Sequence, residues 1–499
     1  MPTPNHELPE ALYSAAQVRA IDAQLIDGGT PGIELMARAA SVVWCALRQH
    51  WPEARSLCVM AGHGNNAGDG YLVAALARRA GWHVEVLAVT DPGRLQGDAA
   101  TAHAEAQVAG VLVKHWSADD VLQGIVLDAL LGTGLSGEVR GPYVAAIQAI
   151  NASGLPVVAV DIPSGLSSDT GQILGCAVKA DLTVSLVGLK FGLLTGQAAD
   201  VVGALVFDDL LVGSPDLLTS PTVAQRLRPA NLPRLAPRPP TAHKGKYGRV
   251  LVIGGDHGTG GATLMAAESS LRCGAGMVSL ATRVEHVAPA LTRLPEVMTV
   301  AVASANQLMP LLEAAAVLVV GPGMGQGAWA RSLLSAVANA DKPQVWDADA
   351  LNLLASGYVS LPRGCVITPH PGEAARLLGS DVARVQADRA SAAHQLAQKY
   401  ASVVVLKGSG SLIAAPDGRL ALCDKGHPAM ATGGLGDVLS GVIGALLAQH
   451  LPPFEAACLA VWLHASAGEE LGTHGRGLAA TDLIPVIRRL LEEQQPCLS

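Results

Sequence analysis

The stretch from Lys425 to Gly441 reads KGHPAMATGGLGDVLSG and decides the fold of the second half of the chain. Its glycines predict a loop, and the apolar residues after them predict the buried face of a helix: Val438, Leu439, Val442 and Ile443. Backbone N–H groups at such a helix start favour an anion. Asp437 lies there and is a candidate base for a bound hydroxyl. This combination suits phosphoryl transfer to an alcohol, although a glycine-rich helix start with a capping aspartate is the simpler alternative.

Length and composition predict a multidomain α/β protein. The chain has 499 residues, which exceeds a single core, so two or more domains are expected. It is 50% hydrophobic but only 3% aromatic, and it has 55 glycines. That composition is typical of parallel sheets packed closely against helices. A formal charge of −8 with scattered Lys and Arg argues against a nucleic-acid partner.

The cysteines and the apolar runs predict a cytoplasmic protein. The 8 cysteines form no C-x-x-C pair, which favours reduced thiols over a disulfide framework or a zinc site. The N-terminus lacks the charged and apolar regions of a signal peptide. No apolar run reaches the roughly 18 residues of a membrane span, so no membrane partner is expected.

The chain is predicted to contain two domains joined by a Pro-rich linker, with boundaries at 1–212, 213–243 and 244–499. The linker prediction rests on the stretch RLRPANLPRLAPRPP, because proline stiffens the chain and removes hydrogen-bond donors. In the first half, a helical lead-in (12–50) precedes alternating strands and helices, which predict a doubly wound parallel sheet. The expected strands are 56–61, 83–89, 125–130 and 156–160, and the expected helices are 71–80 and one after Pro142.

The loop GHGNNAGDG, residues 62–70, follows the first of these strands and opens a helix. Open parallel sheets bind nucleotides and phosphates at such a place. The spacing is not G-x-G-x-x-G, so a hydride-transferring Rossmann site fits poorly. Asn65, Asn66 and Asp69 offer oxygens for a ribose, an amide or a hard cation. An Asx-rich turn that satisfies its own backbone is the alternative.

Two more strands of the first half end in an aspartate followed by glycines. Asp128 precedes GTGLSG, and Asp161 precedes Pro163 and Ser164. One such residue is usually a cap or a turn residue. We expect three consecutive strand ends with acids or amides to converge on one crevice.

These three motifs resemble the YjeF N-terminal family, the NAD(P)H-hydrate epimerases, over about residues 12–212. The resemblance implies a three-layer, Rossmann-like α/β domain that interconverts the R and S hydrates of NADH and NADPH (NADHX and NADPHX). By position, the implied substrate contacts are Asn65, Asn66, Ala67, Gly68, Asp69, Gly132, Thr133, Gly134, Leu135, Ser136, Gly137, Glu138, Tyr143 and Asp161. The implied potassium ligands are Asn66, Asp128 and Ser164. Ala67 departs from the family's usual glycine, and its methyl group requires a negative φ.

Epimerisation needs a group that moves the proton of the hydroxyl on the hydrated carbon while that centre becomes planar. Asp128 and Asp161 are both candidates. The sequence does not choose between them, but an aspartate that holds potassium is less free to act as a base.

The second half contains further strands that end in Gly- or Pro-marked loops, and we expect them to line one edge of a sheet. They lie in 317–325, 344–354, 366–379 and 403–413. The opening GRVLVIGGDHGTGG lacks the P-loop pattern G-x-x-x-x-G-K-[ST]. His370 stands rigidly between two prolines, and Glu373 either caps the next helix or binds a metal through water. The loop 407–411 offers donors for nucleotide phosphates, with an exposed turn as the alternative.

The motifs GPGMG, DADALN, TPHPGE, KG-x-G and ATGGLGDVLSG resemble the YjeF C-terminal family of the ribokinase-like fold over about residues 244–490. The resemblance implies an NAD(P)H-hydrate dehydratase of three-layer α/β/α architecture that uses ADP in bacteria. The implied hydrate contacts are Ala262, Gly323, His370 and Asp437. The implied nucleotide contacts are Lys407, Gly408, Ser409, Gly410, Ser411 and Gly436. His427 departs from the family's usual asparagine.

The implied dehydration uses ADP and Mg²⁺, with AMP and phosphate as products. Asp437 would deprotonate the hydroxyl, which would attack the terminal phosphoryl group of ADP, and phosphate would then leave. A small-molecule kinase fused to a non-catalytic YjeF module is the competing hypothesis. The choice of ADP over ATP is an analogy. A homo-oligomer is expected.

Overall fold

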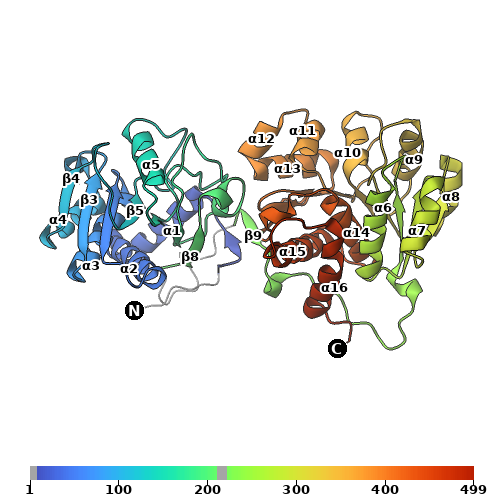
Figure 1. Ribbon diagram of the computed structural model, residues 1–499, viewed down its shortest axis with the longest axis horizontal. Helices are drawn as coiled ribbons and strands as arrows, with labels where there is room; N and C mark the ends of the chain where they lie inside the picture. The colour runs from blue at the N-terminus through green and yellow to red at the C-terminus, as the bar shows by residue number, and fades with distance from the viewer. Residues whose placement is uncertain (1–7, 211–221, 499) are drawn as a thin grey trace. The chain divides into compact units, whose positions relative to one another are not determined.

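The structure is a computed structural model that describes residues 8–210 and 222–498. The chain forms two compact units, Met1–Gln225 and Arg226–Ser499 (Figure 1). The predicted linker falls partly on residues 213–221, which lie outside the described residues. Its described part contains the short strand β9 (Ala224–Arg226) and a 3-10 turn at Pro229–Asn231. The predicted domain boundaries stay a prediction.

The first unit has a seven-stranded parallel sheet in the order β4-β3-β2-β5-β6-β7-β8, which confirms the predicted doubly wound sheet. The strands are β2 (Ser56–Ala61), β3 (His83–Ala88), β4 (Leu112–His115), β5 (Ile125–Ala129), β6 (Val157–Val160), β7 (Leu182–Leu186) and β8 (Ala204–Asp208). The strand order reverses between β2 and β5, which is the position where such sheets bind ligands.

Helices cover both faces of this sheet because alternate strand residues point to opposite faces. On β2, Val59 packs in a cluster with the helices α1 to α4, whereas Met60 packs in a second cluster with α5. The helices are α1 (Ala15–Asp27), α2 (Gly32–His50), α3 (Asn65–Arg79), α4 (Gly97–Val108) and α5 (Pro142–Ala152). This is the expected three-layer arrangement.

The helix α3 begins earlier than predicted. It starts at Asn65, so most of the predicted loop 62–70 forms its first turns, and the predicted helix 71–80 is only its second part. The first N–H groups of a helix have no partner within it, so polar residues such as Asn65 and Asn66 are compatible with the first turn. Ala67 is therefore a buried helical residue, and its methyl group meets the requirement for a negative φ.

In the second unit the strands run in the order β18-β17-β16-β15-β14-β13-β10-β11-β12, and β10 to β16 are parallel. They are β10 (Arg249–Ile253), β11 (Met277–Thr282), β12 (Met298–Ala301), β13 (Val317–Val320), β14 (Gln344–Trp346), β15 (Val366–Ile367) and β16 (Val403–Leu406), followed by the antiparallel β17 (Ser411–Ala414) and β18 (Leu420–Cys423). The four strands predicted at one sheet edge, β13 to β16, are thus neighbours.

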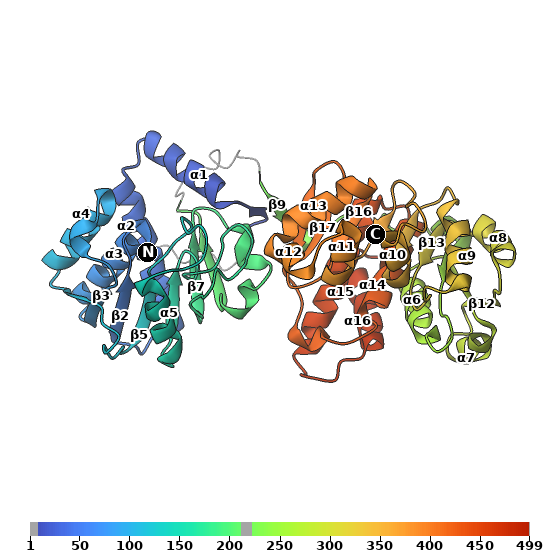
Figure 2. The same cartoon turned by 90° about the horizontal axis from the view of Figure 1, so that it is seen from above.

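Two layers of helices enclose this second sheet (Figure 2). On one face lie α6 (Gly260–Arg272), α14 (Leu435–Ala448), α15 (Pro453–Gly472) and α16 (Leu483–Gln494); the remaining helices are α7 (Val287–Arg293), α8 (Ala305–Ala314), α9 (Ala328–Ala338), α10 (Ala348–Ala355), α11 (Pro371–Leu378), α12 (Val382–Ala387) and α13 (Arg389–Tyr400). Among the described residues, no helix has both the length and the apolar character needed to cross a membrane.

The helix α14 is almost entirely buried. Its predicted apolar face is confirmed, since Val438, Leu439, Val442 and Ile443 are all buried. Gly441 permits the close approach of α6, because a Cβ atom there would lie 2.1 Å from the Ala266 carbonyl oxygen. Such packing fixes the direction of the first turn, which carries Asp437.

Candidate active sites

In the first unit, the strands β2, β5 and β6 are adjacent and parallel, so the three predicted strand ends meet at one edge of the sheet. Asp128 at the end of β5 accepts hydrogen bonds from the backbone N–H and hydroxyl of Ser164, at 2.8 and 2.6 Å, and from the N–H of Leu130 at 3.2 Å. Both carboxylate oxygens are occupied, and the residue is 0% exposed. Burial raises the pKa of Asp128 to about 6, and the hydrogen bonds from Ser164 oppose this.

The amide of Asn66 lies next to the loop that follows Asp128. A Cβ atom on Gly132 would be 3.3 Å from the Cβ atom of Asn66, so α3 and the loop after β5 touch here. Within the described residues, neither the oxygen nor the nitrogen of the buried Asn66 amide makes a hydrogen bond. A buried polar group without a partner is costly, which fits a site built for an ion or a ligand.

Asp161 follows β6 and makes an ion pair with Lys190, whose side chain is fully buried. Its Oδ1 atom also accepts a hydrogen bond of 3.0 Å from the N–H of Leu186. Asp161 has a φ of 65°, which is uncommon for a residue other than glycine and often marks functional sites. Asp161 is therefore held in place by contacts to the last residue of β7 and to Lys190 in the segment after it.

The other predicted substrate contacts of the first unit lie on α3, on the loop after β5 and on α5. Tyr143 lies 2.5 Å from the Nδ1 atom of His63, and the carbonyl of Thr133 accepts a long hydrogen bond from Arg19. The remaining residues are Asn65, Gly68 and Asp69 on α3 and Gly134, Leu135, Ser136, Gly137 and Glu138 in the loop. A Cβ atom on Gly134 or Gly137 would meet open space. Their contacts to a substrate stay a prediction.

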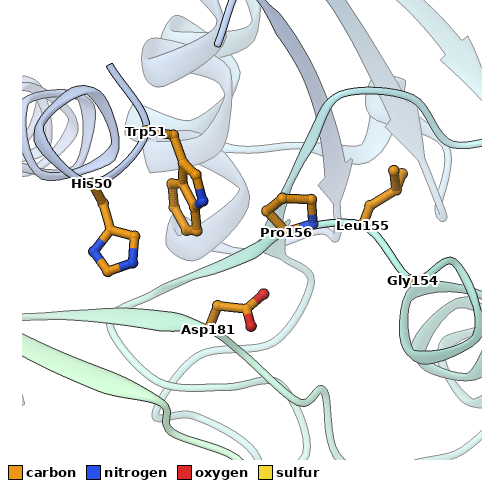
Figure 3. A pocket seen from close by; sticks show the side chains of 6 residues that line it. All are labelled: His50, Trp51, Gly154, Leu155, Pro156 and Asp181. Atoms are coloured by element: carbon orange, nitrogen blue, oxygen red, sulfur yellow. The ribbon is translucent and has the colours of Figure 1, made fainter. Parts of the chain in front are cut away.

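A pocket of about 310 Å³ lies at the opposite edge of this sheet (Figure 3). His50 and Trp51 at the end of α2 face Pro156 and Asp181, which precede β6 and β7. Asp181 uses one carboxylate oxygen to accept the N–H of Val157 at 2.8 Å. The pocket contains no predicted site residue and lies at the amino ends of the strands, so it is separate from the candidate site.

In the second unit, Asp437 lies in the first turn of α14 beside a cluster of charged groups. Gly434 before the helix has a φ of 87°. A Cβ atom on Gly436 would lie 3.1 Å from the Nζ atom of Lys407, so the ammonium group abuts the helix start. The buried His464 of α15 also contacts this turn, since its Nε2 atom lies 3.0 Å from the carbonyl oxygen of Leu435.

Lys407 is paired with acidic groups. Its Nζ atom lies 3.0 Å from Asp347 Oδ1 and 4.0 Å from Glu373 Oε2. The hydroxyl of Thr368 donates to the same oxygen of Asp347 at 2.8 Å. Burial by itself lowers the pKa of Lys407, but Asp347 and Glu373 outweigh it and the pKa is raised. The ammonium group therefore stays charged beside the N-terminus of α14.

In this environment two carboxyl groups have pKa values close to neutral pH. Burial, and then the charge of Asp347, raise the pKa of Asp437 to about 7, although Lys407 lowers it. Burial likewise raises the pKa of Glu373 to about 7, with Lys407 opposing. A carboxyl group with a pKa close to the working pH is suited to proton transfer.

His370 forms a reciprocal cap at the start of α11. Its Nδ1 atom accepts the N–H groups of Gly372 and Glu373 at 2.9 and 3.3 Å, and Glu373 accepts the N–H of His370 at 2.9 Å. Burial and the charge of Lys407 lower the pKa of His370, so its ring is neutral. The expectation that Glu373 caps a helix is confirmed, and its link to a metal stays a prediction.

The predicted phosphate loop, residues 407–411, is the turn between β16 and β17, and a buried arginine organises it. Arg389 is 1% exposed, and its Nη2 atom donates to the carbonyls of Leu406, Lys407 and Gly410 at 3.3 to 3.4 Å. A Cβ atom on Gly408 would lie 2.8 Å from Nη1. The carbonyl groups thus point inward, toward the guanidinium group of Arg389.

The two remaining predicted hydrate contacts also come together. The carbonyl of Gly323 accepts the hydroxyl of Thr259 at 2.7 Å and the N–H of Asp256 at 2.6 Å. Ala262 lies in the first turn of α6, directly after this loop. The carboxylate of Asp349 accepts the N–H of Gly325 at 2.9 Å and so contacts the same glycine-containing loop.

Three residues of these sites were not singled out from the sequence: Asp347, Arg389 and Lys190. Asp347 follows β14, so the rule that identified Asp128 would have found it. Lys190 lies within VSLVGLKFGLL, where a lone cation among apolar residues is an unusual signal. Nothing in the sequence around Arg389 indicates its contacts.

Comparison with known proteins gives matches in both units. Residues 250–489 match the family model described as NAD(P)H-hydrate dehydratase, and residues 32–192 match that of the YjeF-related protein N-terminus. The chain is 44% identical over 484 residues to a protein of Coxiella burnetii named bifunctional NAD(P)H-hydrate repair enzyme, covering 96% of this chain and 99% of the relative. It is 44% identical over 497 residues to the Escherichia coli K12 protein of that name, covering 98% and 95%.

A solved structure also resembles part of the chain. A ribokinase-like superfamily protein from Enterococcus faecalis superposes with a TM-score of 0.52 and 30% identity, covering 55% of this chain and 98% of that protein. This agrees with the expected ribokinase-like fold.

Proposed function

Since the chain belongs to the family of bifunctional NAD(P)H-hydrate repair enzymes, we propose that its second unit dehydrates the S hydrates with ADP and that its first unit epimerises the R and S hydrates. The fusion is useful because a dehydratase selective for one epimer leaves the other unrepaired. The family match disfavours the competing hypothesis of a small-molecule kinase with a non-catalytic first unit. The observation that carries the proposal is the placement of Asp437 and Lys407 at the start of α14.

The dehydration follows from this placement. Asp437 takes the proton of the hydroxyl group, and the oxygen attacks the terminal phosphoryl group of ADP, which releases AMP. Lys407 and the N–H groups at the start of α14 stabilise the developing negative charge. The lone pair of the ring nitrogen then expels phosphate, which is a better leaving group than hydroxide. Loss of a proton from the neighbouring ring carbon to solvent restores the dihydropyridine ring. His370 and Gly323 are proposed to position the hydrate.

The carboxyl groups around Lys407 can attract a divalent cation, although no three His, Cys, Asp or Glu side chains of the described residues are placed to ligate one directly. Burial and neighbouring carboxylates raise the pKa values of Glu373 and Asp437 to about 7, and a cation nearby relieves that repulsion. We propose that Glu373 holds Mg²⁺ through water. When bound, Mg²⁺ would neutralise the phosphate oxygens. The cytoplasmic location and the homo-oligomer stay predictions.

The function is tested with purified protein and a mixture of R and S hydrates, with and without ADP. We expect ADP to restore the absorbance of the reduced coenzyme from both epimers, with one AMP and one phosphate released for each molecule repaired. Without ADP, the epimers should interconvert but no reduced coenzyme should form. Release of a stable phosphorylated product would support the kinase hypothesis instead.

The pKa of Asp437 predicts the pH dependence of dehydration. Because the base must be ionised, kcat/KM should fall on the acid side with a midpoint near the pKa of about 7. Asp349 is one of the carboxylates that raise this pKa, so Asp349→Asn should move the midpoint to lower pH, while its amide oxygen still accepts the N–H of Gly325. Stopped assays across the pH range measure this. An unmoved midpoint in Asp349→Asn would assign the titration to another group.

Asn66, Asp128 and Ser164 are proposed to hold a potassium ion, because the Asn66 amide is buried without a partner in the described structure. A bound ion stabilises the folded state, so KCl should raise the melting temperature of the first unit by about 2–4 °C relative to choline chloride. The variant Asn66→Ala should abolish this difference. Differential scanning calorimetry measures it, and an equal potassium effect in Asn66→Ala would exclude the site.

A further inference from the structure

The buried lysine Lys190 lies against one of the two aspartates that are candidate epimerase bases. Its Nζ atom contacts Oδ1 of Asp161, donates to the carbonyl of Leu186 at 2.7 Å and lies 3.4 Å from the hydroxyl of Ser185. A fully buried lysine is rare unless it is paired, because removing an ammonium group from water is costly. The contacts of Lys190 therefore make it a structural component of this site.

The two aspartates differ in what their oxygens can still do. Both oxygens of Asp128 accept hydrogen bonds, and the residue is 0% exposed. In Asp161 the two contacts converge on Oδ1, while Oδ2 accepts no hydrogen bond from the described residues. The side chain of Asp161 is 18% exposed. At the sheet edge, Asp161 thus offers an oxygen without a hydrogen bond from the described residues, whereas each oxygen of Asp128 already accepts one.

The backbone on both sides of the ion pair has unusual geometry. Asp161 has a φ of 65° and Val187 a φ of 67°, and a β-branched residue rarely adopts that region. The segment that carries Lys190 is tied to Tyr13 by two backbone hydrogen bonds of 2.9 Å, to Leu189 and Phe191. Such strain persists only where the surroundings hold the chain firmly, and it is common at functional sites.

Lys190 is also close to two further carboxyl groups. Burial raises the pKa of Asp22 on α1 to about 6, and burial raises the pKa of Asp69 on α3 well above its usual value. In both cases the charge of Asp161 adds to the rise and Lys190 opposes it. The single ammonium group makes its direct contact with Asp161, so Asp161 is the carboxylate that it neutralises.

We propose that Asp161 is the residue that moves the proton in epimerisation and that Lys190 is its positioning residue; this rests on the epimerase activity proposed above. Oδ2 of Asp161 takes the proton of the hydroxyl group, the oxygen forms a carbonyl, and the bond from that carbon to the ring nitrogen breaks. The nitrogen keeps that electron pair and receives the same proton from Asp161. Reversal of the step on the other face of the aldehyde gives the other epimer.

The test measures interconversion of the R and S hydrates in the full-length protein without ADP. We expect Lys190→Met to lower kcat about 10²-fold with KM changed less than about twofold, since the buried lysine does not contact the substrate. Dehydration of the S hydrate with ADP should be unchanged, which provides an internal control. The exposed Lys179 is a matched control, and Lys179→Met should leave both rates unchanged.

A double variant keeps the proposal falsifiable even if Lys190→Met unfolds the first unit. Lys190→Met with Asp161→Asn removes both charges, so no buried ion is left unpaired. If Lys190 acts through Asp161, the double variant should be as slow as Asp161→Asn alone and no slower. Wild-type epimerisation in Lys190→Met, or multiplied losses in the double variant, would overturn the proposal. Failure of the unmodified protein to interconvert the hydrates would overturn the epimerase function itself.

Discussion

Replacing Asp437 by asparagine is expected to lower ADP-dependent recovery of the reduced coenzyme by at least about 10³-fold, because the hydroxyl group then keeps its proton and cannot attack the phosphoryl group. The amide has nearly the same shape as the carboxyl group, so binding of the hydrate and of ADP should change little. Coupled measurement of coenzyme absorbance and released phosphate gives kcat for each variant.

The stability of Asp437→Asn separates a chemical effect from unfolding. The pKa of Asp437 is raised in the folded state, so its contribution to stability is present at low pH and is lost as the pH rises through about 7. A neutral asparagine avoids this loss, and the variant should melt at the same or a higher temperature than the unmodified protein at pH 8. The exposed Asp417 provides a matched control, since Asp417→Asn should keep full activity. Full recovery of coenzyme by Asp437→Asn would refute the proposed base.

Replacing Lys407 by methionine is expected to have the second largest effect, a loss of about 10²–10³-fold in dehydration. Without the ammonium group, the pKa values of Asp437 and Glu373 rise, because Lys407 lowers both. The acid limb of the pH profile should therefore move to higher pH. The buried Asp347 also loses its ion-pair partner, which costs about 3–5 kcal/mol of folding free energy.

Two further variants identify the cause of that loss. Lys407→Met combined with Asp347→Asn should recover the melting temperature, because the second substitution removes the unpaired charge of Asp347. It should not recover the activity, because the ammonium group of Lys407 is still missing. Lys425→Met removes a lysine whose ion pair with Glu469 is partly exposed, and it should change activity less than about twofold. If Lys407→Met raised KM for ADP but left kcat and the pH profile unchanged, Lys407 would be a simple phosphate contact.

The parts of the molecule that depend on local sequence were predictable. The strand ends at Asp128 and Asp161 and the buried face of α14 follow from strand and helix periodicity, and parallel strands bring their carboxyl ends to one edge. The predicted start of α3 was wrong, because Asn65 and Asn66 are equally compatible with a loop and with the first turn of a helix.

The contacts that complete each site were not predictable in the same way. Arg389 reaches carbonyls 17 to 21 residues away, and Lys190 reaches an aspartate 29 residues away. No local pattern encodes such pairings, because they arise only when the strands are arranged in the sheet. The chain therefore shows where chemistry occurs more readily than what holds the reacting groups in place.

The close contact between α14 and α6 has a consequence for natural variation in this protein. A single added methyl group at Gly441, one helical turn beyond Asp437, would act as a wedge against the Ala266 carbonyl and tilt the base away from its target. A harmful allele can thus arise by a change between two small apolar residues, with every polar group of the catalytic centre intact. A genetic survey that scores only charged or conserved polar positions would overlook it.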